Sequence, residues 1–188
     1  MTGHSQVVVE AVDPESEEAT ALRDAMRAEV RNRYLDLITP TSPEPPSEPF
    51  GAGCTLLLAW FGGEAVACAG LRPMEDGAVE VRRMYVVPAW RRRGIARLLL
   101  AALEKLAMEG GHHALRLETG TRQPEALALY ESYGFHRIPA YGRHVGDPMS
   151  VCFEKRVKRK PRRTKRHHRR MHTHLEKPKG TRDSRQRR

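Results

Sequence analysis

The 188-residue sequence lacks several patterns that would assign it to a membrane, secreted or disulfide-rich class. It has no run of about 18 apolar residues, as a membrane-spanning helix requires, and its first residues lack the charged and then apolar order of a secretory signal. We therefore expect a soluble cytoplasmic protein. Only three cysteines occur, far apart in apolar strand-like segments, which predicts free buried thiols rather than disulfides, metal ligands or nucleophiles: Cys54, Cys68 and Cys152.

Two glycine-rich phosphate-binding motifs are also absent. The chain contains neither Gly-x4-Gly-Lys-Ser/Thr, the phosphate loop of many nucleotide hydrolases, nor Gly-x-Gly-x-x-Gly, which opens a dinucleotide-binding fold. Aromatic residues make up only 6% of the chain, but 39% of it is hydrophobic, which is enough for one core. Length and composition together predict one domain with an appendage.

The formal net charge of +10 is unevenly distributed. Residues 155–188 hold 17 Lys and Arg against two acidic residues, a charge of +15, whereas residues 1–154 hold 16 against 21, a charge of −5. Because the basic segment has no aromatic residue and very few aliphatic ones, it cannot bury a core. We predict a globular domain over residues 1–155 and a disordered basic tail over residues 156–188.

The tail has two interpretations. Its cations would attract RNA, DNA or an acidic membrane surface without sequence preference, or it is a solvated extension without a selected role. Its histidines lack a carboxylate or cysteine to complete a metal site, and the neighbouring arginines would repel a cation, so no metal is predicted: His167, His168, His172 and His174.

The most informative segment runs from Glu80 to Ala96. A strand-like run ends near Pro88, a short basic turn has a glycine at its tip, and an apolar pattern of helical period follows. The first N–H groups of a helix have no partner inside the helix, and its dipole adds about half a positive charge there, so this turn predicts a cradle for a diphosphate. Gly94 leaves the backbone accessible, and three arginines supply charged donors: Arg91, Arg92 and Arg93. The other interpretation is an arginine-rich surface turn.

The spacing Arg91-x-x-Gly94-x-Ala96 after a strand resembles the acyl-CoA signature of the GNAT superfamily of N-acetyltransferases. A second segment, residues 115–135, combines an alternating strand, Pro124 at a first helical position and Gly134 as a helix stop. Its string Ala-Leu-Ala-Leu-Tyr-Glu-Ser-Tyr-Gly-Phe is similar to the GNAT segment in which a helix packs beside the pantetheine arm. Two independent motifs therefore occur in the order that the family has.

The remaining periodicities complete a fold. Helices are predicted over residues 14–32, from Ile95 through Leu106, and from Pro124 to just before Gly134. Strands are predicted over residues 6–12, 55–61, 64–71, 79–87, 115–118, 135–138 and 150–155. This order predicts an α+β fold with a mixed, mostly antiparallel central sheet flanked by helices, which the resemblance identifies as the GNAT-like acyl-CoA N-acyltransferase fold.

The resemblance implies a V-shaped gap between the strand that ends at Val87 and the strand over residues 115–119. The pantetheine arm of acetyl-CoA would lie there and pair with the backbone of Tyr85, Val86 and Val87 as an added strand would. The diphosphate would lie on the basic turn, in contact with Arg91, Arg92, Arg93, Gly94, Ile95 and Ala96. Family members commonly have an asparagine near the start of the following helix, where this chain has Gln123.

Acetyl transfer to an amine needs a base for the amine, a donor for the thioester carbonyl and an acid for the departing thiolate. The resemblance assigns the carbonyl to a backbone N–H near Val86. Glu80 is the candidate base, directly or through water, because strand periodicity places it on one side with Arg82, Met84 and Val86 unless a bulge intervenes. Alternatively, Glu80 pairs with Arg82 or Arg83 as a surface charge.

Tyr130 is the candidate acid. A phenol with an ordinary pKa near 10 stays protonated at neutral pH and can hydrogen-bond or protonate the thioester sulfur. It could instead fill the space between helix and sheet, as we expect of Tyr133, the fallback acid. No spacing joins the histidines outside the tail to a nucleophile, so they stay unassigned: His112, His113, His136 and His144.

Two segments could border an acceptor site. Residues 39–53 contain five prolines, and residues 139–148 offer Tyr141 and Arg143, although either could be a plain connector. The first hypothesis is an N-acetyltransferase that uses acetyl-CoA and an amine acceptor of unidentified kind, by direct transfer in a ternary complex. The second is an acyl-CoA-sensing or nucleic-acid-associated protein with a GNAT-like domain and a polyanion-binding tail. A homodimer is compatible with the resemblance.

Overall fold

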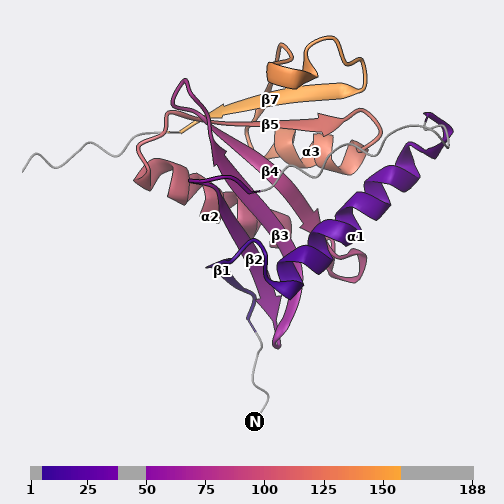
Figure 1. The fold of residues 1–188 in the computed structure, drawn as a ribbon, viewed down its shortest axis with the longest axis vertical. Coiled ribbons are helices and arrows are strands. Elements are labelled where there is room, and N and C mark those ends of the chain that lie inside the picture. The colour runs from indigo at the N-terminus through magenta and orange to yellow at the C-terminus, as the bar shows by residue number, and fades with distance from the viewer. Residues whose placement is uncertain (1–5, 38–49, 158–188) are drawn as a thin grey trace, which may run out of the picture.

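The computed structural model describes residues 6–37 and 50–157, and these ranges form a mixed seven-stranded sheet flanked by three α-helices (Figure 1). The helices are α1 Glu17–Arg33, α2 Ile95–Glu109 and α3 Pro124–Ser132. The strands are β1 Val8–Val12, β2 Thr55–Phe61, β3 Glu64–Pro73, β4 Val79–Val86, β5 Ala114–Gly120, β6 His136–Ile138 and β7 Ser150–Arg156. Most of the proline-rich segment and nearly all of the basic tail lie outside the described residues.

The predicted fold class is confirmed. The strand order is β1-β2-β3-β4-β5-β7-β6, and every neighbouring pair is antiparallel except β4 with β5. Each predicted helix and strand is present, with ends that differ by a few residues. Strand β5 extends past its predicted end at Glu118. The alternation of buried and less buried side chains along this strand continues to Thr119, which is buried.

Helices cover both faces of the sheet. On one face, α2 buries an apolar stripe against the sheet, in a core that also includes Tyr130 of α3: Ile95, Leu99, Leu100, Leu103 and Ala107. On the other face, Ala19 and Leu22 of α1 pack against a smaller cluster that contains Leu56, Leu58 and Cys68. Within residues 6–37 and 50–157, no helix has the length and apolarity to span a membrane.

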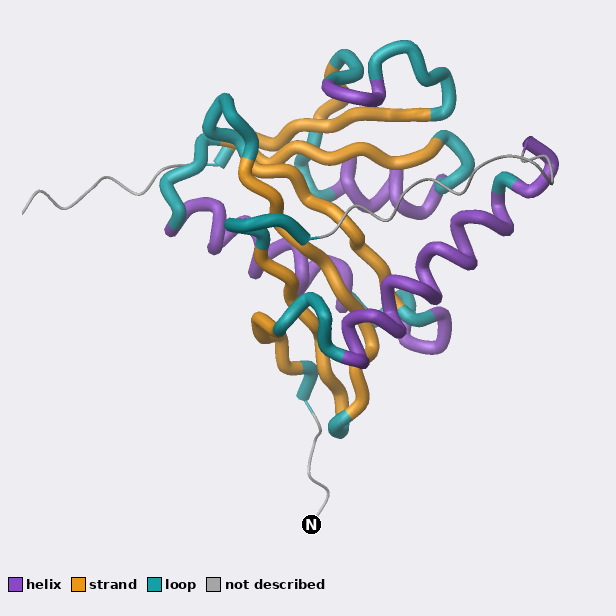
Figure 2. The backbone as a smooth tube through the Cα atoms, in the orientation of Figure 1, coloured by secondary structure: helices purple, strands orange, loops and turns teal. Residues whose placement is uncertain are grey.

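The sheet splits between β4 and β5. These parallel strands pair only at Val79 with Leu115 and at Glu80 with Arg116, and then separate. Figure 2 shows the two orange strands diverging from a shared start, with α3 visible between them. The expected V-shaped gap is therefore present, and in the part of the chain that the structure describes each strand has an inner edge without a sheet partner beyond the second pair.

A bulge in β4 corrects one prediction. The pairing of β3 with β4 slips by one residue between Cys68–Tyr85 and Gly70–Arg82, and Arg83 has a φ of +56°. Met84 and Val86 consequently pack with the α2 core, whereas Tyr85 and Val87 pack with the α1 cluster. The prediction that Glu80 and Arg82 share a side with Met84 and Val86 is wrong, because the extra residue reverses the alternation.

Candidate active site

A cleft of about 620 Å³ opens where β4 and β5 separate. Its walls come from α1, the end of β4, the turn that leads into α2, and α3. Nine of the twelve predicted site residues line it: Tyr85, Val86, Arg91, Arg92, Gly94, Ile95, Ala96, Gln123 and Tyr130. The other three lie outside its lining: Glu80, Val87 and Arg93. The structure thus brings together two motifs that are well separated in the sequence.

The turn before α2 has the geometry of an anion cradle. Gly94 is the N-cap of the helix and has a φ of +80°, a conformation that favours glycine. A Cβ atom at Gly94 would meet nothing within 4 Å, so the space above this backbone is open. The first turn of α2 contains no acidic side chain to compete for its N–H groups. A phosphate group can therefore approach these N–H groups closely.

The three arginines of the turn occupy different environments. Arg91 points inward, where its Nε donates to the carbonyl oxygen of Val86 at 2.9 Å and its guanidinium pairs with Glu29. Arg93 is exposed and lies over the ring of Trp90, 4.8 Å from the centroid. Arg92 is exposed as well. Only Arg92 and Arg93 thus present their charge at the surface of the turn.

The end of β4 turns one set of backbone groups into the cleft. The N–H of Val87 donates to the carbonyl oxygen of Val66 on β3, at 3.0 Å. Because successive residues of a strand direct their polar groups to opposite edges, the N–H and C=O of Val86 face the gap, where that oxygen meets Arg91. Val86 therefore offers its N–H to the cleft, while the N–H of Val87 belongs to the sheet.

Tyr130 combines a buried ring with a hydroxyl at the cleft. Its ring packs against Phe135 and Phe153, with centroid distances of 5.7 and 5.9 Å. Its hydroxyl lies 3.5 Å from the sulfur of Met84, which also lines the cleft. Burial, and to a lesser degree the charge of Glu118, raises the pKa of Tyr130 far above its ordinary value. The phenol therefore remains a proton donor at any working pH.

Tyr133 lies outside the lining of the cleft. Its hydroxyl donates to Glu104 at 3.3 Å, and the ammonium of Lys155 lies 4.2 Å from its ring centroid. Lys155 also pairs with Glu104 at 2.8 Å. Of the two tyrosines on this segment, only Tyr130 directs its hydroxyl toward a cleft residue.

Glu80 is buried on the sheet face that α1 covers, rather than exposed as a surface charge. Its Oε2 lies 2.7 Å from Arg72 and 3.5 Å from Arg82, and its Oε1 accepts a hydrogen bond from Tyr141 at 3.0 Å. It stands at the point where β4 and β5 last pair, the apex of the gap. The sequence indicated pairing with Arg82 as an alternative to a catalytic role for Glu80, but it gave no indication of the contacts with Arg72 and Tyr141.

A polar bridge joins α1 to the start of α3 across the cleft. Arg33 contacts Glu29 at 3.1 Å and Glu125 at 3.0 Å, and also donates to the carbonyl oxygen of Arg122 at 3.2 Å. Arg122 in turn pairs with Asp36. Except for Glu29 and Arg33, which are four positions apart, these partners lie about ninety positions apart in the chain, so local sequence patterns carried no signal for the bridge between the helices.

Comparison with known proteins identifies the family. The sequence model of the acetyltransferase (GNAT) family matches residues 21–135, which include both motifs and the cleft residues of β4, α2 and α3. The chain belongs to the GNAT family of acetyltransferases. It is therefore an acyltransferase, of a family that uses acetyl-CoA.

Individual relatives agree with the family assignment. The chain is 36% identical to the IAA acetyltransferase of Azospirillum brasilense over 125 residues, which cover 66% of this chain and 76% of the relative. An acyl-CoA N-acyltransferase structure from Klebsiella pneumoniae superposes with a TM-score of 0.67 at 33% identity, covering 81% of this chain and 98% of that one. A GNAT family acetyltransferase of Elizabethkingia anophelis, solved with acetyl-CoA bound, shares the fold with a TM-score of 0.58 at 17% identity, covering 80% and 98%.

Proposed function

We propose that this GNAT protein transfers the acetyl group of acetyl-CoA directly to an amine, with both substrates bound at once. One observation carries the proposal: the hydroxyl of Tyr130 and the N–H of Val86 are directed to the cleft that also contains the open turn at Gly94. An acid, a donor for a carbonyl oxygen and an anion cradle thus share one cavity, as thioester chemistry requires.

The residues of the cleft fit acetyl-CoA along its length. The N–H groups at the start of α2, with Arg92 beside them, suit the diphosphate. Apolar side chains of β4 and α3 suit the pantetheine arm: Met84, Ala126 and Leu129. The inner edge of β4 offers hydrogen bonds to its amides once Arg91 releases the carbonyl oxygen of Val86.

Three groups of the protein each carry out one part of the reaction. Glu80 takes a proton from the acceptor ammonium, directly or through water, so that the nitrogen has a lone pair. The N–H of Val86 stabilises the negative charge that develops on the carbonyl oxygen while the C–N bond forms. Tyr130 gives its proton to the sulfur as the C–S bond breaks. The second proton, which the nitrogen loses as the amide forms, returns to the Tyr130 phenolate through solvent, and Glu80 releases its proton to solvent. The products are the N-acetylated amine and free CoA.

Direct transfer is supported by the composition of the cleft. Among the described residues that line it, there is no cysteine and no serine to carry an acyl group. The three cysteines lie elsewhere, and burial raises the pKa of the Cys68 thiol to about 12. Within residues 6–37 and 50–157, an acyl-enzyme would therefore lack a suitable nucleophile in the cleft.

The test is release of CoA thiol from acetyl-CoA with a panel of acceptors. The panel holds peptide N-termini, lysine, polyamines, amino acids and aminoglycosides, together with IAA because a relative carries it in its name. With an active acceptor, initial rates at varied concentrations of both substrates should give intersecting double-reciprocal lines. Parallel lines would contradict direct transfer.

If calorimetry detects binding of acetyl-CoA but no acceptor in the panel gives release of CoA, the result would contradict acetyl transfer and favour an acyl-CoA sensor. The basic tail that would attach such a sensor to a polyanion lies almost wholly outside the described residues. Truncation after Val157, a buried core residue that follows β7, separates the two functions: acetyl transfer should persist, and retention on a polyanion column should be lost.

A further inference from the structure

The loop between β6 and β7 reaches across the divided sheet. Tyr141 in this loop donates its hydroxyl hydrogen to Oε1 of Glu80 on β4, 61 positions away in the chain, at 3.0 Å. β6 and β7 belong to the half of the sheet beyond the split, and β4 belongs to the other half. Like the pairing of β4 with β5 and the ion pair of Arg116 with Asp76, this hydrogen bond therefore links the two halves near the apex of the gap.

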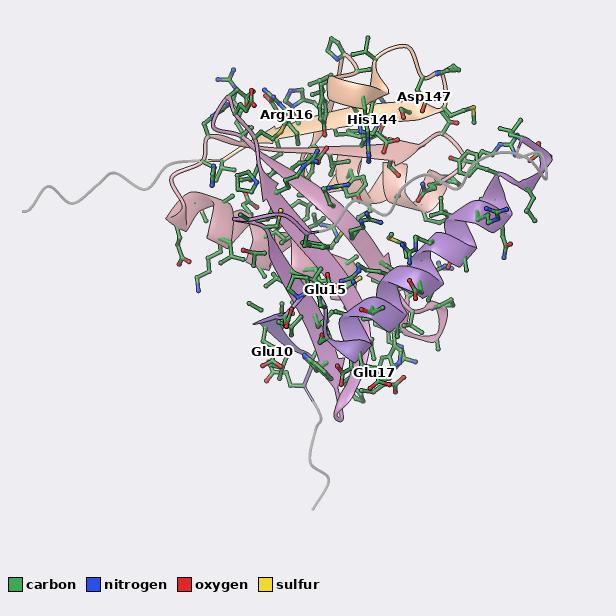
Figure 3. All side chains as sticks on the ribbon, in the orientation of Figure 1. Glu10, Glu15, Glu17, Arg116, His144 and Asp147 are labelled. Atoms are coloured by element: carbon green, nitrogen blue, oxygen red, sulfur yellow. The ribbon has the colours of Figure 1, made fainter. Side chains whose placement is uncertain are left out.

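Contacts with β5 and the residue that follows it fix the end of the loop where it enters β7. Ser150 donates to Oε1 of Glu118 at 2.8 Å, and the N–H of Thr121 donates to the carbonyl oxygen of Met149 at 2.8 Å. The ring of His144 lies edge-on to that of Tyr141, with centroids 5.8 Å apart. Figure 3 shows His144 beside β5 and β7, with Asp147 further along the loop. Tyr141 is thus placed by its neighbours rather than free to rotate.

Glu80 is held from three elements. Arg72 of β3 and Arg82 of β4 lie on Oε2, and Tyr141 lies on Oε1. Arg116 of β5 pairs with Glu80 in register, but its guanidinium forms ion pairs with Asp76 and Glu154. Burial, and to a lesser degree the charges of Glu118 and Glu80, raises the pKa of the Cys152 thiol on β7. Tyr141 is therefore the uncharged partner that determines where Oε1 points.

Tyr141 itself is unsuited to accept a proton. Burial, together with the charge of Glu80, raises its pKa far above the ordinary value for a phenol. It therefore stays a donor throughout the working pH range. A hydrogen bond donated to a carboxylate favours its ionised form and fixes its orientation.

We propose that Tyr141 is a positioning residue that orients Glu80 toward the acceptor amine and adjusts how readily it takes the amine's proton. This inference rests on the proposed function, in which Glu80 is the base. Without the hydroxyl of Tyr141, the carboxylate loses both the fixed orientation of Oε1 and a hydrogen bond. Both changes act on the acceptor half of the reaction, because Tyr141 and Glu80 lie outside the lining of the cleft that suits acetyl-CoA.

The experiment compares Tyr141→Phe with the unaltered full-length chain, using an acceptor found in the amine panel. We expect kcat to fall about 10-fold and the acidic limb of the profile of kcat/KM against pH to move to higher pH. The KM for acetyl-CoA and its affinity by calorimetry should stay unchanged. Tyr133→Phe is the matched control, because it removes another tyrosine-to-glutamate hydrogen bond, 3.3 Å long, away from the cleft. It should leave the rate and the profile unchanged.

A double-mutant cycle with Glu80→Gln tests whether Tyr141 acts through Glu80. Tyr141→Phe should have no further effect on kcat in the Glu80→Gln background. An unchanged rate and pH profile for Tyr141→Phe, or equal losses in both backgrounds, would overturn the positioning role but leave acetyl transfer intact. Absence of CoA release by the unaltered protein would instead count against the proposed function.

If Tyr141→Phe does not fold, His144→Ala provides the second variant, because it keeps the hydroxyl but removes the ring that lies against Tyr141. We then expect a smaller shift of the acidic limb in the same direction. No shift in a folded His144→Ala protein would overturn the proposal.

Discussion

The hydroxyl of Tyr130 donates to the thioether sulfur of Met84 across 3.5 Å. A weak acceptor of this kind is readily replaced, and both residues line the cleft between β4 and α3. The cleft therefore already accommodates a sulfur atom beside the phenol, as the proposed reaction requires for the thioester sulfur.

Tyr130→Phe should lower kcat about 100-fold while leaving the affinity for acetyl-CoA nearly unchanged. The substitution keeps the ring packing with Phe135 and Phe153 and removes only the donor. Thiol release and calorimetry with the purified variant measure the two quantities. A rate equal to that of the unaltered enzyme would exclude Tyr130 as the acid.

Gly94→Asp should weaken acetyl-CoA binding at least 10-fold, because it places a carboxylate where the diphosphate is proposed to bind and forces a side chain into a left-handed conformation. Gly111→Asp is the matched control. Gly111 has a φ of +77°, also has open space at its Cβ, and follows the other end of α2. Calorimetry should show the loss for Gly94→Asp alone, and equal affinities would place the diphosphate elsewhere.

Lowering the pH should weaken the ion pair between Glu29 and Arg91, which links α1 to the turn before α2. Arg91 beside Glu29 holds the pKa of that carboxyl below its ordinary value of 4.5. Because the folded-state pKa is the lower one, the pair stabilises the fold above about pH 4.5, and this contribution is lost as the pH falls through the folded value. Glu29→Gln should therefore lower the urea midpoint at pH 7 and lower it by less at pH 3.5.

The control for this pH dependence is Glu109→Gln. Glu109 forms an exposed pair with Lys105, at 3.9 Å within α2. Such a surface pair contributes little, about 0.3 to 0.5 kcal/mol, so the urea midpoint should change only marginally at both pH values. A difference between Glu29→Gln and the unaltered protein that stays constant from pH 7 to 3.5 would contradict the linkage.

Two adjacent leucines of α2 should differ sharply in their effect on stability. Leu99 is fully buried in the main core, whereas Leu98 is 48% exposed. Leu99→Ala should lower the free energy of unfolding by about 2 to 5 kcal/mol, and Leu98→Ala by less than about 1 kcal/mol. Urea denaturation followed by circular dichroism measures both, and similar values would mean that α2 packs on a different face.

Much of the fold and the cradle could be predicted from the sequence because their determinants are local. The change of period around Gly94 indicates a strand, a turn and a helix in that order, and the structure has them. Pro124 opens α3 at the predicted position for the same reason. The family motifs added the gap between β4 and β5, which periodicity alone does not reveal.

The features that could not be predicted depend on distant or unusual geometry. Arg83 adopts a left-handed conformation without being glycine, so nothing in the local pattern marked the bulge. This bulge puts Glu80 and Met84 on different faces of the sheet. Tyr141 meets Glu80 only through the sheet order, in which β7 lies between β5 and β6. Arg91 was expected to contact phosphate, but its guanidinium contacts Glu29 on α1, an element far upstream in the chain.

The two strands that part after Glu80 and Arg116 have inner edges that, within the described residues, no neighbouring strand pairs beyond that point. Hydrogen-bonding capacity of this sort is thermodynamically costly when empty and invites pairing with stray peptide segments. A coenzyme arm that forms these hydrogen bonds takes the place of a neighbouring strand. If acetyl-CoA binds there as proposed, it stabilises the folded state, and the melting temperature should keep rising with the logarithm of its concentration above the Kd.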